Sequence, residues 1–348
     1  MVNRTEGTGR QADGAGAGTE SAAGRTVAFI GLGNMGGPMA ANLAAAGHRV
    51  VGHDLSADAL AAAAARGVVP APSAVEAVPG ADVVITMLPA GRHVLALYRD
   101  EGLLAAAAPG TLFVDCSTID VADARAAHAA AVEAGHRGLD APVSGGVLGA
   151  EAGTLTFMAG GGTAEFTEAE PLLTAMGKRV VHCGEPGAGQ AAKICNNMIL
   201  GVSMVAVSEA FVLGESLGLS PQALFDVAST ASGQCWALTS NCPVPGPVPA
   251  SPANRDYRPG FAAALMAKDL GLAAGAARAG GVDAELGLRA ARLYAEFAAD
   301  GGAAQDFSAI VRTIRRRSGT DGPTDRLATS GASDTPAVPD TPAAPDTP

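Results

Sequence analysis

A lysine and an asparagine stand four residues apart in the small, apolar segment Gly187-Ala188-Gly189-Gln190-Ala191-Ala192-Lys193-Ile194-Cys195-Asn196-Asn197. In a helix, this spacing puts Lys193 and Asn197 on one face. Such a lysine either extends its amine to solvent or performs chemistry. The positive end of the helix, and Lys268 if it lies nearby, would lower the lysine pKa from ~10.4 toward the ~7–8 of a general base. We therefore predict that Lys193 is a base and that Asn197 orients a substrate hydroxyl.

A glycine turn, Gly31-x-Gly33-x-x-Gly36, follows one apolar run, and Asp54 ends the next. Between a strand and a helix, such glycines allow a tight turn, close approach of a pyrophosphate, and close helix–strand packing. A carboxylate at position 54 can bind the 2′-hydroxyl of an adenosine ribose and repel a 2′-phosphate. With Leu32, Asn34 and Met35, these residues predict a site for NAD rather than NADP. The alternatives are a purely structural turn and an Asp54 that only caps the next helix.

A third polar segment, Asp140-Ala141-Pro142-Val143-Ser144-Gly145-Gly146, follows a short apolar run. The hydroxyl of Ser144 and the backbone N–H groups of Gly145 and Gly146 could donate to one anion, such as a small carboxylate. A plain loop is an equally good interpretation of this segment. It is not a hydrolase nucleophile turn, because the sequence contains no GxSxG.

Two kinds of element have to position these residues. Short apolar runs that predict strands alternate with Ala-rich runs that predict helices in the first half of the chain, which favours a parallel sheet covered on both faces. The expected strands are Thr26–Ile30, Arg49–His53, Asp82–Met87, Thr111–Asp115 and Leu155–Ala159, and the expected helices are Met35–Ala46, Ala57–Arg66, Arg92–Tyr98 and Val121–Ala134. After Gly187 only helices are expected, over Ala188–Leu217, Gln222–Ala228, Phe261–Ala279 and Ala284–Ala299.

We therefore predict an α/β Rossmann domain followed by an all-α domain, joined by a long interdomain helix. The Rossmann domain spans 25–187 and the helical substrate and dimerisation domain spans 188–317. Residues 1–24 are rich in Gly, Ala and Thr, and residues 318–348 repeat Thr-Pro and Ala-Pro. Neither composition can bury a core, so both ends are predicted to be disordered tails.

Composition excludes several classes of partner. The 348 residues include 23 Lys+Arg and 34 Asp+Glu, a formal charge of −11, and only 4% aromatic residues. This acidic balance argues against nucleic acid and anionic membranes as partners. The most apolar run, Met198–Val207, is shorter than the ~20 residues of a span, and the N-terminus lacks the apolar region of a signal peptide. We expect a cytoplasmic protein with buried, reduced cysteines and no metal site, since no CxxC pair occurs.

Taken together, the motifs GLGNMG, DAPVSGG, GTLTFMAGG, GQAAKICNN and LMAKDLGLA resemble those of the β-hydroxyacid dehydrogenases over about residues 25–315. Within that family, the stretch from SGQCW to LMAKDLGLA is most similar to the 3-hydroxyisobutyrate dehydrogenases of valine catabolism. The resemblance implies a Rossmann domain, a long helix and an all-α domain, assembled as homodimers or homotetramers.

The resemblance also implies a role for each matching residue. Lys193 would be the catalytic base, Asn197 would position the substrate, and Ser144, Gly145 and Gly146 would hold its carboxylate. Lys268 would line the site beside Asp269 and also contact the cofactor. The cofactor contacts would come from Leu88, Pro89 and Thr118, together with His93, which stands where this group often has Asn.

The implied reaction is the NAD-dependent oxidation of 3-hydroxyisobutyrate to methylmalonate semialdehyde. The alternatives are another reaction of the family, such as reduction of tartronate semialdehyde or succinic semialdehyde, and a nucleotide-binding scaffold without catalysis. The scaffold is disfavoured because its members typically lack the lysine that stands here as Lys193.

Overall fold

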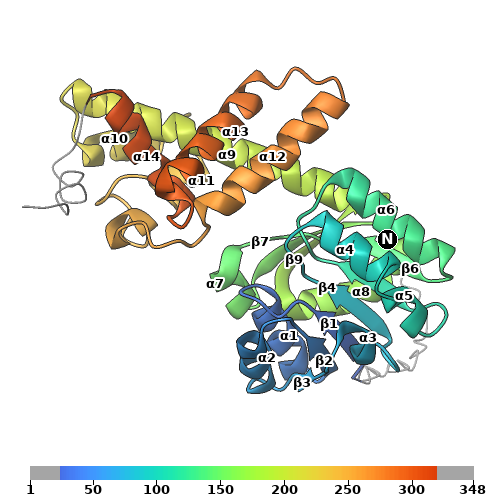
Figure 1. Ribbon diagram of the computed structural model, residues 1–348. Helices are drawn as coiled ribbons and strands as arrows, with labels where there is room; N and C mark the ends of the chain where they lie inside the picture. Colours follow the sequence, from blue (N-terminus) through green and yellow to red (C-terminus); the bar gives the residue numbers. More distant parts are fainter. Residues whose placement is uncertain (1–23, 320–348) are drawn as a thin grey trace, which may run out of the picture.

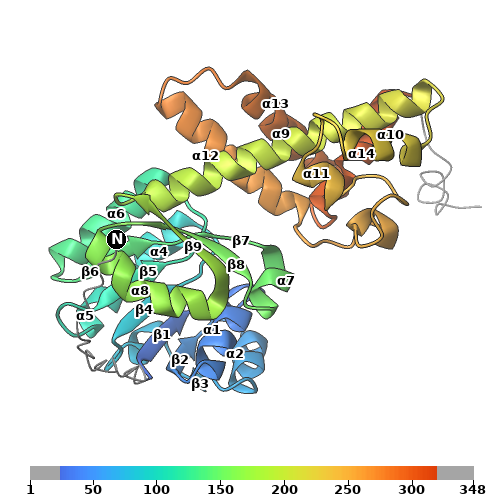
Figure 2. The same ribbon diagram turned by 180° about the vertical axis from the view of Figure 1, so that it is seen from behind.

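The computed structural model describes residues 24–319. The tails predicted at 1–24 and 318–348 lie almost wholly outside these residues. Figures 1 and 2 show an α/β part, which contains the sheet, and a helical part, with helix α9 (Ala188–Ser216) running from one into the other. The fold class predicted from the sequence is confirmed. The boundaries between domains stay predictions, although the last strand ends at Gly184 and the last helix at Arg317.

One mixed sheet organises the α/β part. Its strands are β1 (Thr26–Ile30), β2 (Arg49–His53), β3 (Val69–Pro70), β4 (Val83–Thr86), β5 (Leu112–Asp115), β6 (Arg137–Asp140), β7 (Val143–Ser144), β8 (Leu155–Gly160) and β9 (Gly177–Gly184). They are ordered β3-β2-β1-β4-β5-β6-β8-β7, with β9 also paired to β8. The strands from β3 to β6 are parallel, whereas β8 runs antiparallel to β6 and β7. The expectation of a wholly parallel sheet is therefore wrong at this end.

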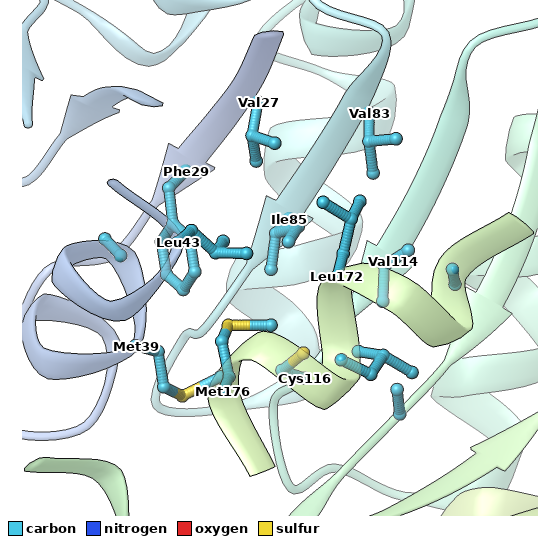
Figure 3. Packing of buried hydrophobic residues seen from close by; sticks show 14 of the residues in the cluster. Val27, Phe29, Met39, Leu43, Val83, Ile85, Val114, Cys116, Leu172 and Met176 are labelled. Carbon is cyan, nitrogen blue, oxygen red and sulfur yellow. The ribbon is translucent and has the colours of Figure 1, made fainter. Parts of the chain in front are cut away.

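Helices cover both faces of the sheet, as the alternating side chains of its strands require. In β1, Val27 and Phe29 belong to one core cluster and Ala28 and Ile30 to another. The first cluster includes residues of α1 (Gly36–Ala45) and α8 (Thr163–Met176), and Figure 3 shows Met39, Leu43, Leu172 and Met176 packed over the sheet. The second contains residues of α3 (Ala74–Ala77), α4 (Gly91–Arg99), α5 (Leu103–Ala106) and α6 (Val121–Glu133). The remaining helices of this part are α2 (Ala57–Ala64) and α7 (Gly146–Glu151).

The helical part forms its own core around the second half of α9. Its other helices are α10 (Pro221–Ala228), α11 (Trp236–Thr239), α12 (Ala263–Ala279), α13 (Glu285–Phe297) and α14 (Ile310–Arg317), with short 3₁₀ or π turns at Pro252–Arg255, Ala298–Gly302 and Phe307–Ala309. Met204 and Phe211 of α9 pack in one cluster with Met266 of α12, Tyr294 of α13 and Ile310 of α14. The helix α14, which the sequence analysis did not identify, thus completes this core.

By length and composition, α9 is apolar enough to cross a membrane, which the run Met198–Val207 alone is not. Its most apolar window is 44% buried inside the protein, and the helix contacts α12, α13 and α14. Central helices of soluble proteins have the same length and composition. In this fold, α9 is the element around which the helical part is built.

Candidate active site

The glycine turn and Asp54 meet at the carboxyl ends of β1 and β2. Gly31 has a φ of +95°, and a Cβ there would lie 2.3 Å from the carbonyl oxygen of Met87. The Asp54 carboxylate accepts hydrogen bonds from Leu32 N and Ser56 N, both at 2.7 Å. The N-cap of α2 is Ser56, whose hydroxyl accepts from Ala59 N at 3.3 Å. The alternative in which Asp54 caps that helix is therefore wrong.

The turn fits a dinucleotide phosphate. A Cβ added to Gly33 would meet no atom within 4 Å, so this side of the backbone is open to a ligand. No side chain caps α1. Gly37 N already donates to Gly33 O at 3.0 Å and Pro38 has no N–H, so the Gly36 N–H and the helix dipole are what α1 offers to an anion. These two features match the expected pyrophosphate position.

Two further loops lie at the ends of the neighbouring strands. Leu88, after β4, donates from its backbone N–H to Ser117 Oγ, after β5, at 2.8 Å. Lys268 of α12 donates from Nζ to the carbonyl oxygens of Thr118, at 2.9 Å, and Pro89, at 3.3 Å. The expected cofactor loops are thus joined to each other and to the helical part.

His93 lies in the first turn of α4, after the loop of Leu88 and Pro89. Its Nδ1 atom is buried and has no hydrogen-bond partner among the described residues. The structure places it near the expected cofactor loops, and its contact with a cofactor stays a prediction.

Lys193 and Asn197 share the buried face of α9. Lys193 is 6% exposed, and among the described residues its amine makes no hydrogen bond or ion pair. Asn197 Nδ2 donates to Asp269 Oδ2 at 2.6 Å, and Asp269 Oδ1 lies 3.8 Å from Lys268 Nζ. The interpretation in which Lys193 extends to solvent is therefore wrong.

The surroundings of Lys193 disfavour its charged form. Burial lowers the pKa of Lys193, and the nearby Lys268 lowers it further, whereas Asp269 opposes the shift. Burial also raises the pKa of Asp269, against the attraction of both lysines. Lys268 thus lowers the pKa of Lys193, as the sequence predicted. An amine on a buried side chain, with a lowered pKa and no partner among the described residues, can accept a proton from a bound alcohol.

The start of α9 is anchored by two buried side chains that the sequence analysis did not assign. Asp140, at the end of β6, accepts from Gly187 N at 2.7 Å and Gln190 N at 2.9 Å. The carboxamide of Gln190 binds the backbone of Ser117 and Ile119. For Asp140 the available signal was a polar residue at the end of an apolar run, but its partners lie 47 and 50 residues away. For Gln190 the neighbouring sequence carries no such signal, and its partners lie 71 and 73 residues away.

The segment Ser144–Gly146 runs from the last residue of β7 to the first residue of α7. Gly145 and Gly146 have φ values of +134° and +62°, which glycine adopts without strain. A Cβ on Gly146 would lie 3.0 Å from Gly260 O, so the loop borders the helical part. None of the hydrogen bonds among the described residues joins it to Lys193 or Asn197. Its contact with a substrate carboxylate stays a prediction.

Four of the five cysteines are at least partly buried. Cys116 and Cys242 are buried, Cys183 and Cys235 are partly buried, and all five cysteines are free. Cys195 of α9 is exposed, so the expectation of buried thiols is wrong for it.

Comparisons with known proteins agree with this geometry. Residues 26–184 match the model of the NAD binding domain of 6-phosphogluconate dehydrogenase. Residues 187–314 match the model described as NAD-binding of NADP-dependent 3-hydroxyisobutyrate dehydrogenase. A probable 3-hydroxyisobutyrate dehydrogenase of Mycobacterium bovis is 59% identical over 292 residues, which cover 84% of this chain and 98% of that relative. The chain belongs to the 3-hydroxyisobutyrate dehydrogenase family.

Relatives of this dehydrogenase family differ in the substrate that they are named for. An NAD-dependent L-serine dehydrogenase of Pseudomonas aeruginosa is 50% identical over 289 residues, 83% of this chain and 97% of the relative. The solved structure of a Mycobacterium tuberculosis 3-hydroxyisobutyrate dehydrogenase with L-serine has a TM-score of 0.82 and 58% identity, covering 84% of this chain and 99% of that one. The protein is thus an oxidoreductase with a nicotinamide cofactor, and the resemblance seen in its motifs is confirmed.

Proposed function

We propose that the protein oxidises 3-hydroxyisobutyrate to methylmalonate semialdehyde with NAD, and that Lys193 is the general base. The observation that supports this most is the buried Lys193 side chain beside the Asn197–Asp269 pair, with an amine that has no partner in residues 24–319. The preference for NAD is supported by Asp54, whose carboxylate reaches the glycine turn and would repel a 2′-phosphate.

In the proposed reaction, neutral Lys193 accepts the proton of the substrate hydroxyl while the C–O bond becomes a carbonyl. The bound nicotinamide supplies the hydride acceptor for the hydrogen on the same carbon. Asn197, held by Asp269, orients the substrate oxygen, and Ser144, Gly145 and Gly146 bind the carboxylate. The resulting Lys193 ammonium gains attraction from Asp269, the effect that already opposes the lowering of its pKa.

L-serine is a second candidate substrate. It carries an ammonium group where 3-hydroxyisobutyrate carries a methyl group, and both are 3-hydroxy acids with the same reacting alcohol. This candidate is supported by the relative named for L-serine and by the related structure with L-serine. A panel of both acids, hydroxyacids of the tartronate and succinate series, and the two cofactors NAD and NADP would compare the values of kcat/KM. A preference for L-serine would overturn the substrate assignment but not the role of Lys193.

Lys193→Met tests the base itself. We expect kcat to fall by ~10²–10⁴-fold, the usual contribution of general-base catalysis, while NADH binding measured by fluorescence remains. Lys178→Met, at an exposed position of β9, is the matched control. A Lys193→Met variant with near-normal turnover would overturn the mechanism.

We also propose that the protein forms a homodimer or homotetramer through its helical part. The exposed apolar side chains Ile199 and Leu213 of α9, and Leu217 directly after it, support this proposal, because burying apolar surface between two copies is favourable. Light scattering would measure the assembly, and a monomer over the whole concentration range would contradict it. A cytoplasmic location without nucleic-acid or membrane partners stays a prediction.

A further inference from the structure

Gln190 binds the loop around Thr118 from both sides. It lies on α9, three residues before Lys193, and its side chain is 0% exposed. Its Nε2 donates to Ser117 O at 2.7 Å, and its Oε1 accepts from Ile119 N at 3.1 Å. The carboxamide thereby satisfies one acceptor and one donor of the buried backbone that flanks Thr118.

We propose that Gln190 is a positioning residue that fixes the Lys193 amine relative to the loop of Thr118, where the nicotinamide is expected. The inference rests on the function proposed above. Residues three apart lie on neighbouring faces of a helix and rise by about 4.5 Å along its axis. Two directional hydrogen bonds one turn before the base therefore set both the rotation and the height of Lys193 against this loop.

Other contacts hold the helix when the carboxamide is absent. Asp140 binds the backbone N–H groups of Gly187 and Gln190, which no side-chain substitution at position 190 removes. The loop keeps the hydrogen bond from Lys268 to Thr118 O. Loss of the carboxamide should therefore loosen the alignment of the two elements more than their folding. A displacement of about 1 Å in a reacting group can cost ~10²-fold in rate.

Two variants separate positioning from simple stability. Gln190→Met keeps the size of the side chain and removes both hydrogen bonds. Gln190→Glu, when protonated, still offers one acceptor and one O–H donor, but its ionised form cannot donate to Ser117 O. Protonated Glu is therefore a conservative replacement at low pH only.

Several charged groups act on a carboxyl at this position. Asp140 of β6 binds the N–H of residue 190, and Asp115 of β5 binds Ser117. Both carboxylates, together with burial, favour the protonated form. Lys268 of α12, which binds Thr118 O, favours the ionised form, and Lys193 of α9 does so when it is protonated. The Glu variant should thus lose activity relative to wild type as the pH rises.

The experiment measures kcat, the KM for substrate, and the binding of NADH from acidic to alkaline pH. For Gln190→Met we expect a fall in kcat of ~10–100-fold at every pH, with NADH binding kept. For Gln190→Glu we expect the ratio of its kcat to that of wild type to approach one at low pH and to fall as the pH rises. A Gln190→Met variant with the same kcat and pH profile as wild type would overturn the inference. If that variant does not fold, a ratio that stays constant with pH in Gln190→Glu would overturn it.

A matched control removes the same kind of contact elsewhere. Ser251 is buried, its Oγ donates to Cys242 O at 2.6 Å, and it accepts from Ala253 N at 3.3 Å. Ser251→Ala should lower the melting temperature but leave kcat unchanged. Lys193→Met separates the two proposals, because normal turnover in that variant refutes the proposed mechanism. An inactive Lys193→Met beside a fully active Gln190→Met refutes only the role of Gln190.

Discussion

Asp115→Asn should stabilise the protein relative to wild type progressively as the pH rises above 4. Asp115 ends β5 and is 4% exposed. Its Oδ1 accepts hydrogen bonds from Thr86 Oγ1 at 2.7 Å, Ser117 Oγ at 2.6 Å and Ser117 N at 3.2 Å. Its Oδ2 is buried and has no partner among the described residues. Burial, only partly offset by these bonds, raises the pKa of Asp115 from 3.8 to about 6.

The size of the effect follows from this shift. A folded pKa above the unfolded one means that the folded state resists ionisation, so its penalty is absent well below pH 3.8 and complete above about pH 6. At 1.36 kcal/mol per pKa unit, the full penalty is about 3 kcal/mol. Asn keeps an oxygen for the three donors and removes the charge. The difference in unfolding free energy, variant minus wild type, should rise by roughly 2–3 kcal/mol between about pH 4 and pH 7.

Urea unfolding followed by circular dichroism at several pH values measures this difference. Asp58→Asn, the same substitution at an exposed position of α2, controls for the chemical change itself. Burying an Asn amide has a cost in free energy that does not vary with pH. This cost does not affect the result, because the prediction concerns only the change with pH. A difference that stays flat from pH 4 to pH 7 would refute the reasoning and show that the Asp115 charge is accommodated in the fold.

Three further predictions concern the site. Lys193→Met should raise the free energy of unfolding at neutral pH, since the buried lysine has a lowered pKa. Measured by urea unfolding, this gain should shrink as the pH rises and vanish above ~10.4, where the lysine of the unfolded chain is also neutral. Gly189→Ala should cost ~1–3 kcal/mol in the same assay, because its Cβ would lie 2.2 Å from Met158 O, whereas Gly271→Ala on α12 meets no atom within 4 Å and should be neutral or stabilising. Asp54→Ser should lower the ratio of kcat/KM for NAD over NADP by about tenfold or more, the value of one lost charge-assisted hydrogen bond, and an unchanged ratio would contradict the ribose contact.

The sequence could predict those parts of the site that depend on the spacing of residues close together in the chain. The glycine turn lies between a strand and a helix in consecutive residues, and Lys193 and Asn197 share a face because they are four residues apart. Strand β1 matches its expected bounds because Val27–Ile30 is an uninterrupted apolar run. Strand β2 matches because its valines, Val50 and Val51, lie between the turn at Gly47 and the polar Asp54. In each of these cases, the pattern and the structure depend on the same few neighbouring residues.

The parts that could not be predicted depend on contacts between distant residues. Gln190 lies 71 and 73 residues from its two partners, and nothing in its own neighbourhood marks them. The two-residue strands β3 and β7 are too short to show a period. The reversal of β8 follows from its pairing with β6 and β7, and not from its apolar run, which reads like that of any buried strand.

The anchoring of α9 explains how the fold holds a lysine with a lowered pKa near a helix start. Gly187, at the N-cap, has a φ of +87° and provides no side-chain cap, and Gly189 leaves no room for a Cβ against Met158 O. The helix can therefore pack directly on β8, and Asp140 supplies the missing negative charge to its first N–H groups from the sheet. Two hydrogen bonds from backbone N–H groups occupy the Asp140 carboxylate. Asp140 does not contribute to the pKa shift of Lys193. The fold thus stabilises the helix terminus with one carboxylate while it leaves the amine one turn further on desolvated, which is the condition that a lysine base requires.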